Sequence, residues 1–262
     1  MEKWAILPFN GVFFTCLGLF VALLVISSVL LRKKSEKTRK LVLAGAMIFT
    51  FLVFVWYKIM LSMDKEYDEV RIANGIAPFS WWTELPLQLC NINMILIPIG
   101  VLTNNRFLKG FSFFVAPLGA LLALVMPCTG FTGYSIFLPR NIGYYFTHFM
   151  VLIGGIALGS FKLFRPTFKD IIPIILNMLF ISVLIFLVNM VLRWTNLAPG
   201  ANYFYSVETD GNAILDLFHS WIPYPFLYLL PALPLIILPY MLIETGIFTL
   251  VRKIKAKKTV TE

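Results

Sequence analysis

Residues 12–31 read VFFTCLGLFVALLVISSVLL, twenty consecutive positions without a charged side chain. A helix rises about 1.5 Å per residue, so this run matches the ~30 Å hydrocarbon core of a bilayer. It is followed by RKKSEKTRK at 32–40, and such basic flanks mark the cytoplasmic end of a transmembrane helix. The N-terminus lacks the basic region and cleavage site of a signal peptide, so we expect a retained membrane-spanning helix.

The composition extends this expectation to the whole chain. Apolar residues make up 59% and charged residues 13%, with a mean hydropathy of +0.84. Soluble domains are about half apolar and a quarter charged, so a soluble fold is excluded. We predict an all-α membrane protein in which residues 1–262 form a single polytopic domain. Spans are expected near 12–31, 41–62, 85–102, 111–126, 142–161, 171–192 and 225–251.

The distribution of charge predicts the topology. Sixteen of the 22 Lys and Arg residues fall on the side that holds 32–40 and the C-terminal tail, and nine of the 13 acids fall on the other side. Alternating sides are consistent only with an odd number of spans. We therefore expect about seven helices in the cell (plasma) membrane, with the N-terminus outside and the C-terminus cytoplasmic. The basic clusters behind the net charge of +9 are then topology determinants and do not predict a nucleic-acid partner.

Two long connections lie on the expected outer side, at 64–84 and 194–224. Loops of this length are uncommon unless they are functional or disordered, and the aromatic content of both argues against disorder. We predict that 194–224 caps the cavity between the third, fifth and sixth spans, with Asn202 facing inward. The same aromatic residues would also suit the membrane interface. A short amphipathic helix is expected at 212–221, and the prolines at 231, 234 and 239 should bend the last span.

Polar residues open the third expected span. At about 100° per residue, Glu84, Gln88 and Asn91 would form one stripe of a helix, with Cys90 and Asn93 on a second face. A helix end that is polar on two faces should be surrounded by other helices and not by lipid. Polar groups inside a bilayer are costly, which makes them candidates for function. Cys90 would lie ~9 Å below the outer surface.

A second polar stripe opens the fifth expected span. Arg140, Asn141, Tyr144 and His148 fall within about 100° of helical arc. His148 would lie ~10 Å deep, at the depth of Cys90 and below the same leaflet. Equal depth makes an approach of the thiol and the imidazole possible, and we predict that the two groups lie close together. That the third and fifth spans are neighbours is an assumption of this prediction.

The proposed chemistry needs both groups. A free thiol is only a few per cent thiolate at neutral pH, and a neighbouring imidazole can accept its proton. The Arg140 guanidinium matches the geometry of a lipid phosphate, and Arg193 should lie near the same outer surface. Simpler interpretations stay open: Cys90 as a core residue, His148 bonded to a neighbouring helix, and Arg140 as an interfacial anchor.

Metals and cofactors are not expected. The three cysteines, Cys16, Cys90 and Cys128, show no CxxC spacing and have no paired histidines nearby. Cys16 and Cys128 have no polar neighbours in the sequence, so we interpret them as core residues.

The segment LPLQLC at 85–90 resembles the bacterial YwaF-like membrane proteins and their eukaryotic relative, transmembrane protein 164. The likeness continues through YFTH at 145–148, GANY at 200–203 and IPY at 222–224. It covers most of the chain from the third span onward, whereas the first two spans match no pattern of the family.

The resemblance implies a function. The eukaryotic relative is regarded as a cysteine-dependent lipid acyltransferase that works with a histidine on ether phospholipids. This would make Cys90 the nucleophile and His148 the general base, and the substrate a membrane phospholipid or other acylated lipid. Candidate orienting or oxyanion groups are Gln88, Asn93, Asn202 and Tyr144. The alternative is a non-enzymatic seven-helix membrane sensor or small-solute carrier that uses the same polar cavity.

Overall fold

Helix α1, Gly11–Leu31, forms from the apolar run that opens the chain. Asn10 caps it, because its side chain accepts a hydrogen bond from the Phe13 N–H at 2.9 Å. The computed structural model describes residues 3–260, so the ends of the expected domain, 1–2 and 261–262, lie outside the described residues. The helices that follow are α2 (Glu36–Leu61), α3 (Lys65–Ala73), α4 (Asn93–Leu102), α5 (Arg106–Val125), α6 (Pro139–Ser160), α7 (Ile171–Trp194), α8 (Ala213–Trp221) and α9 (Leu238–Val260).

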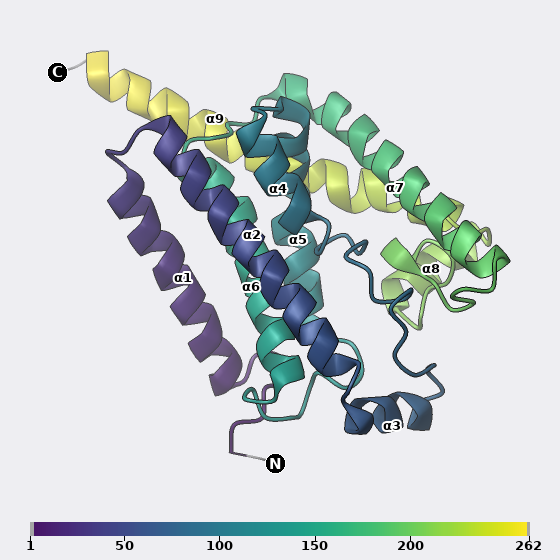
Figure 1. The fold of residues 1–262 in the computed structure, drawn as a ribbon. Helices are drawn as coiled ribbons and strands as arrows, with labels where there is room; N and C mark the ends of the chain where they lie inside the picture. Colours follow the sequence, from purple (N-terminus) through teal and green to yellow (C-terminus); the bar gives the residue numbers. More distant parts are fainter. Residues whose placement is uncertain (1–2, 261–262) are drawn as a thin grey trace.

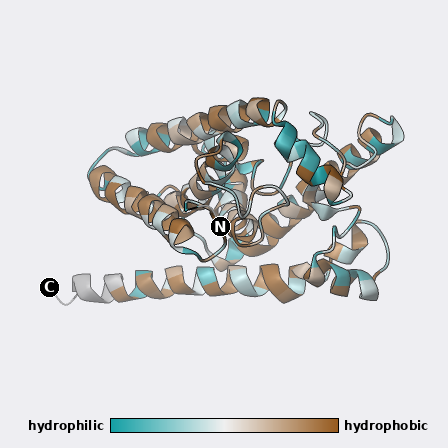
Figure 2. Cartoon of the chain, turned by 90° about the horizontal axis from the view of Figure 1, so that it is seen from below, coloured by the Kyte–Doolittle hydropathy of each residue, from teal (hydrophilic) through white to brown (hydrophobic). Residues whose placement is uncertain are grey.

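Within residues 3–260, six helices are long and apolar enough to cross a membrane: α1, α2, α5, α6, α7 and the segment that ends in α9. The expected all-α membrane fold is confirmed. Helix α6 lies at the centre of the bundle (Figure 1) and is the most deeply buried of the six, whereas few of the described residues of α1 and of the segment that ends in α9 are buried. The long helices are hydrophobic along much of their length, as lipid contact requires (Figure 2).

Glycines on α6 let its neighbours approach closely. A Cβ on Gly143 would collide with Tyr57 of α2, and one on Gly155 would lie 2.5 Å from Cδ of Pro117 in α5. Small residues at such crossings are typical of membrane helices, because packing at short range is what holds them together in lipid. The backbone of α6 is therefore placed directly between α2 and α5.

The third expected span differs from the prediction. A helix was expected from residue 85, but α4 begins only at Asn93 and has ten residues, or about 15 Å of rise. Turns occupy 81–92, partly because Pro86 has no N–H and disfavours the helical region for Leu85. The helical stripe expected for Glu84, Gln88 and Asn91 is therefore wrong. The seventh crossing stays a prediction.

This non-helical segment runs as an irregular thread between α5 and α8 (Figure 1). Irregular backbone at membrane depth is tolerated only where protein surrounds it or where it lines a cavity. The segment meets that condition through bonds to distant parts of the chain. The N–H of Leu85, for example, donates to the Tyr203 hydroxyl at 2.9 Å.

The last span is interrupted near its prolines, as expected. A 3-10 turn at Leu227–Leu229 and a π-helix at Leu233–Ile237 precede α9. Residues 213–221 form the short helix α8, which begins after the cap residue Asn212. Its Phe218 is buried, and Ile214, Leu217 and Trp221 are about half exposed.

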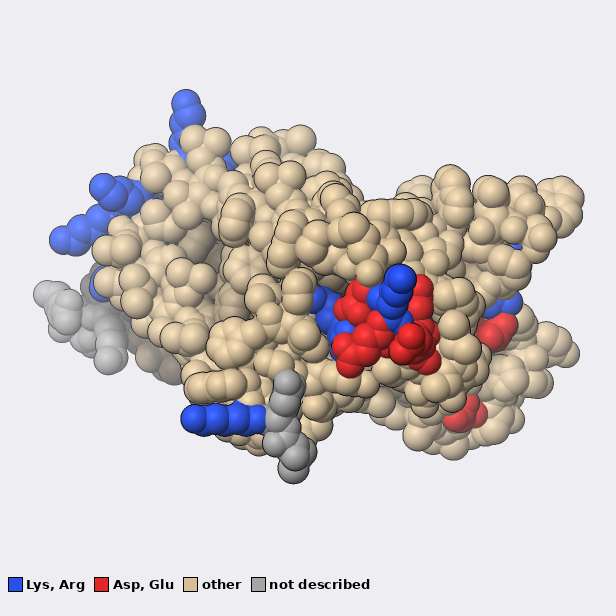
Figure 3. Space-filling view, turned by 60° about the horizontal axis from the view of Figure 1, so that its bottom comes forward, with Lys and Arg blue, Asp and Glu red and all other residues tan. Residues whose placement is uncertain are grey.

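Charged residues gather on the face that carries α3 and the N-terminal segment. Figure 3 shows acidic side chains clustered there around basic ones, and the acids of this region are Asp64, Glu66, Asp68 and Glu69. The sequence places most of its lysines and arginines at the other ends of the spans. This separation agrees with an outer face that is acidic and an inner face that is basic.

Reporter fusions provide the test of topology. Reporters joined after Lys37 or at Lys257 should report the cytoplasm, and reporters inserted near Asn74 or Asp210 should report the outside. The physical reason is the excess of Lys and Arg in the short connections on one side. If one reporter were found on the opposite side, the topology would have one crossing fewer than predicted. Residues 85–92 would then lie below the other leaflet.

Candidate functional site

Cys90 and His148 lie next to each other inside the bundle. Cys90 is at the end of the irregular segment, against Gly119 of α5, and His148 projects from the middle of α6. The distance from Cys90 Sγ to His148 Nε2 is 3.4 Å, within the ~5 Å that an apo nucleophile–base pair allows. The two residues are 7% and 4% exposed. The structure thus brings together the two groups that the sequence singled out.

The backbone of α6 orients the imidazole. Nδ1 of His148 lies 2.7 Å from the carbonyl oxygen of Tyr144. A carbonyl can only accept, so Nδ1 carries the proton and Nε2 presents its lone pair to the thiol. The ring of Tyr144 packs beside the imidazole, with ring centroids 4.2 Å apart. The Tyr144 hydroxyl donates to the carbonyl of Ala123 at 2.7 Å. The geometry therefore suits proton transfer from sulfur to Nε2.

Asn91 is a neighbour that sequence reasoning placed elsewhere. Its Oδ1 lies 3.6 Å from Sγ of Cys90, although the expected helix put the two residues on different faces. Asn93, by contrast, donates from Nδ2 to the Leu89 carbonyl at 2.8 Å, and its buried Oδ1 has no hydrogen-bond partner among the described residues. The polar residues around Cys90 in the sequence did indicate a site. The error was to assume that they lie on a helix, which put Asn91 and Cys90 on different faces.

The side chains of Gln88 and Asn202 form hydrogen bonds with backbone N–H groups of residues 204–208. Oε1 of Gln88 accepts the N–H of Phe204 at 3.0 Å. Oδ1 of Asn202 accepts the N–H groups of Val207 and Glu208 at 3.0 and 3.1 Å. Asn202 is therefore bonded within its own loop and not to Cys90, which differs from the inward orientation expected from the sequence.

The two arginines expected to hold a phosphate are already paired. The guanidinium of Arg140, 1% exposed, lies 2.6 Å from Asp64 and 3.3 Å from Glu66. Eight residues separate it from His148 along α6, about 12 Å of rise. Arg193 contacts Glu208 at 2.7 Å and donates to the carbonyl of Ala201 at 2.7 Å. The structure does not bring either arginine to the thiol.

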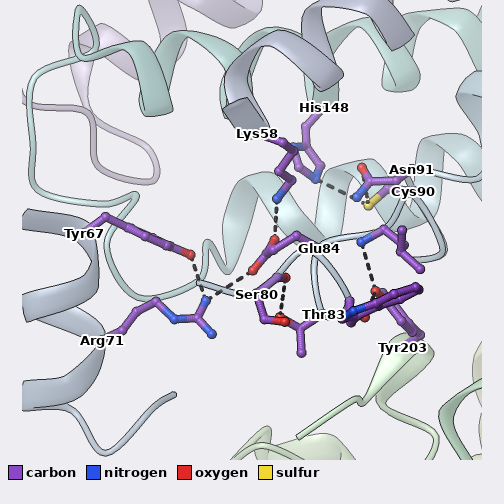
Figure 4. Close-up of polar contacts among 12 residues, drawn as sticks. Lys58, Tyr67, Arg71, Ser80, Thr83, Glu84, Cys90, Asn91, His148 and Tyr203 are labelled. Atoms are coloured by element: carbon purple, nitrogen blue, oxygen red, sulfur yellow. Dashed lines mark hydrogen bonds and ion pairs between the residues drawn. The ribbon is translucent and has the colours of Figure 1, made fainter. Parts of the chain in front are cut away.

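A buried group of charges lies beside the pair instead, and the sequence analysis missed it. Lys58, near the C-terminal end of α2, contacts Glu84 at 2.5 Å, and Arg71 of α3 contacts the same carboxylate at 3.4 Å. Arg71 also contacts the Tyr67 hydroxyl at 2.9 Å. Figure 4 shows Lys58 alongside His148, with its ammonium directed at Glu84. The signal for Lys58 in the sequence is that it is a charged residue inside the apolar run 41–62.

The connection 194–224 is anchored to α7. The buried Asn189 accepts the N–H of Tyr203 at 2.9 Å and donates to the Tyr203 carbonyl and to Ser206 at 2.9 and 2.8 Å. The hydroxyl of Tyr203 donates to the Trp82 carbonyl at 2.8 Å. Residues around 203 therefore hold both α7 and the segment that leads to Cys90.

Comparison with known proteins decides the family. The TMEM164 family model matches residues 5–243, which include both Cys90 and His148. The chain belongs to the TMEM164 family. No curated protein and no solved structure matches it.

Membership covers more of the chain than the sequence motifs suggested. The match begins ahead of α1, so the first two spans also belong to the TMEM164 family domain. Together with six apolar helices among the described residues, it identifies this TMEM164 family member as a multi-pass membrane protein. The relation to transmembrane protein 164 expected from the motifs is confirmed.

Asn189 provides a test of how the loop of this TMEM164 family member is held. Asn189→Leu should destabilise the protein, because Tyr203 and Ser206 would lose buried partners at about 1–3 kcal/mol for each unsatisfied group. Thermal unfolding in detergent and limited proteolysis within 194–224 would measure the effect. Asn177→Leu is the matched control on α7, since its Nδ2 has no hydrogen-bond partner among the described residues. Equal losses in both variants would contradict the anchoring role.

Proposed function

We propose that this protein is a lipid acyltransferase or acyl hydrolase of the plasma membrane that opens to the outer leaflet. The observation that supports it is the 3.4 Å contact between the Cys90 sulfur and Nε2 of His148. An imidazole oriented by a backbone carbonyl, with its free nitrogen on a thiol, is the usual arrangement for activating a nucleophile. The predicted depth of the pair suits the ester bonds of a membrane lipid.

The reaction proceeds in two balanced steps. Nε2 of His148 accepts the thiol proton as the Cys90 sulfur attacks the ester carbonyl carbon, and the carbonyl electron pair moves to oxygen. Collapse of this intermediate expels the lipid alkoxide, which takes the proton from His148 and leaves an acyl thioester on Cys90. A hydroxyl of an acceptor lipid, or water, then attacks the thioester with His148 again as base, and the thiol is restored.

General-base assistance of this kind contributes about 10²–10⁴-fold, so the site needs further stabilisation of the developing charge. Asn91 is close to the sulfur, whereas the Tyr144 hydroxyl donates to the Ala123 carbonyl and Asn93 donates to the Leu89 carbonyl. Arg140 and Arg193 could bind a lipid phosphate only after release from Asp64, Glu66 and Glu208. We therefore propose no phosphate contact for either arginine in this state.

The alternative function is a non-enzymatic membrane sensor or small-solute carrier. The observation that favours it is that Cys90 packs within the main apolar core, where a thiol is usually a small hydrophobic residue. A bound ligand distinguishes the two functions: acyl tails favour the enzyme, and a compact polar solute favours the carrier.

Trapping of the thioester tests the proposal. The purified protein is incubated with phospholipid vesicles, digested without thiol reductant and analysed by mass spectrometry. The peptide that contains Cys90 should gain the mass of an acyl chain, and hydroxylamine should remove that mass because thioesters are labile to it. An unmodified Cys90 under turnover conditions would leave the proposal without its intermediate.

A further inference from the structure

The buried charges beside Cys90 do not balance. Lys58 and Arg71 both contact Glu84, so two cations share one carboxylate. All three side chains are largely buried, at 7%, 15% and 13% exposure. Burial raises the pKa of Tyr67 to about 12, so its phenol stays neutral and adds no negative charge. One positive charge is therefore left in excess, in a place where unpaired charge is costly.

The excess charge lies beside the Cys90–His148 pair. Tyr57, the residue before Lys58, packs against Gly143 of α6, five positions before His148 on the same helix. Glu84 is on the same irregular segment as Cys90. Figure 4 shows the Lys58 side chain beside His148, whose Nε2 lies 3.4 Å from the Cys90 sulfur. Figure 4 shows Lys58, His148, Glu84 and Cys90 together in one close-up.

Two of the other candidate donors of the site are occupied. Asn93 donates to Leu89, and Gln88 lies at the outer loop with Phe204. An ammonium has three N–H donors, and the bond of Lys58 to Glu84 uses one of them. The ammonium also lies 4.6 Å from the centroid of the Tyr57 ring. Lys58 therefore has both the charge and a donor for an anion that forms at the sulfur.

We propose that Lys58 is the electrostatic residue of this site, whose ammonium stabilises the negative charge that develops on the Cys90 sulfur and on the carbonyl oxygen under attack, and that Glu84 positions it. This inference rests on the proposed acyl transfer for its role in turnover. Its effect on the thiol can be measured without any lipid.

Lys58 and Glu84 should have opposite effects on the ionisation of the Cys90 thiol. Removal of the Lys58 charge disfavours the thiolate, whereas removal of the Glu84 charge leaves Lys58 and Arg71 unopposed and favours it. The other titratable groups that face Cys90 are His148 and Tyr144 from α6, Cys128 from the connection after α5, and Tyr205 from the outer loop. None of these changes in either variant.

The experiment is the rate of Cys90 alkylation by iodoacetamide as a function of pH, measured on the Cys90 peptide of the full-length protein by mass spectrometry. Lys58→Gln should move the midpoint of the rate profile to higher pH and slow alkylation about tenfold at neutral pH. Glu84→Gln should move the midpoint to lower pH. Lys58→Arg should stay near the wild-type profile, and Lys65→Gln, an exposed lysine of α3, is the control.

A purely structural role predicts a different result, because loss of packing changes both variants in the same direction. Midpoints that do not move, or that move together, would overturn the inference. If Lys58→Gln does not fold, the Glu84→Gln variant still tests the inference. An alkylation midpoint that does not shift in Glu84→Gln would exclude the electrostatic role of Lys58. Opposite shifts in a protein that never forms a thioester would support the role of Lys58 and reject acyl transfer.

Discussion

Replacing Cys90 by serine should abolish the acyl thioester on the protein and all turnover of phospholipid. The change is nearly isosteric, so the fold should persist, but a hydroxyl forms no thioester and is a far weaker nucleophile than a thiol beside an imidazole. Mass spectrometry of the peptide that contains residue 90, together with release of lysophospholipid, would measure both effects. Thermal unfolding should be close to that of the unchanged protein.

Cys16→Ser is the matched control, because Cys16 lies half-buried on α1, away from the pair. This variant should keep both the thioester and the turnover. If Cys90→Ser retained full activity, acyl transfer through this residue would be excluded, and the sensor or carrier function would take its place.

The second large effect is expected at His148. His148→Ala should slow thioester formation about 10²–10⁴-fold, the usual contribution of a general base. Expression should persist, because the lost bonds are those to Cys90 and to the Tyr144 carbonyl. The rate should recover in part at high pH, where the thiol ionises without the imidazole. Stopped incubation with phospholipid vesicles across a pH series would measure this.

Tyr144→Phe is the control that distinguishes the role of the His148 imidazole from that of the residues packed around it. It removes the hydroxyl that donates to Ala123 but keeps the backbone carbonyl that orients Nδ1 of His148. We expect a rate close to that of the unchanged protein. An His148→Ala variant as fast as Tyr144→Phe would show that the imidazole does not act as a base.

The membrane fold and the position of the pair could be predicted from sequence for the same physical reason. Apolar runs of bilayer length indicate helices, and the constant rise of a helix converts residue number into depth. Cys90 and His148 were thus expected at one depth below one leaflet. Their adjacency could not be derived in this way, because depth does not specify which helices are neighbours.

The errors arose where tertiary contacts override local pattern. Residues 85–92 have the composition of a span but are held as turns by partners far along the chain. Arg140 looked available for a phosphate, yet Asp64 and Glu66, more than seventy positions away, occupy it. Lys58 resembled a lysine at the end of a span, and its burial against Glu84 depends on how that irregular segment folds.

The irregular segment also orders events during biosynthesis. Its backbone cannot satisfy itself as a helix does, and the partners of Leu85 and Gln88 are Tyr203 and Phe204, separated from them by 118 and 116 positions. Those partners leave the ribosome only after five of the six long helices have been made. The segment that carries Cys90 therefore waits, without its final hydrogen bonds, while most of the protein is synthesised. The thiol reaches its finished surroundings as one of the last steps in making the chain.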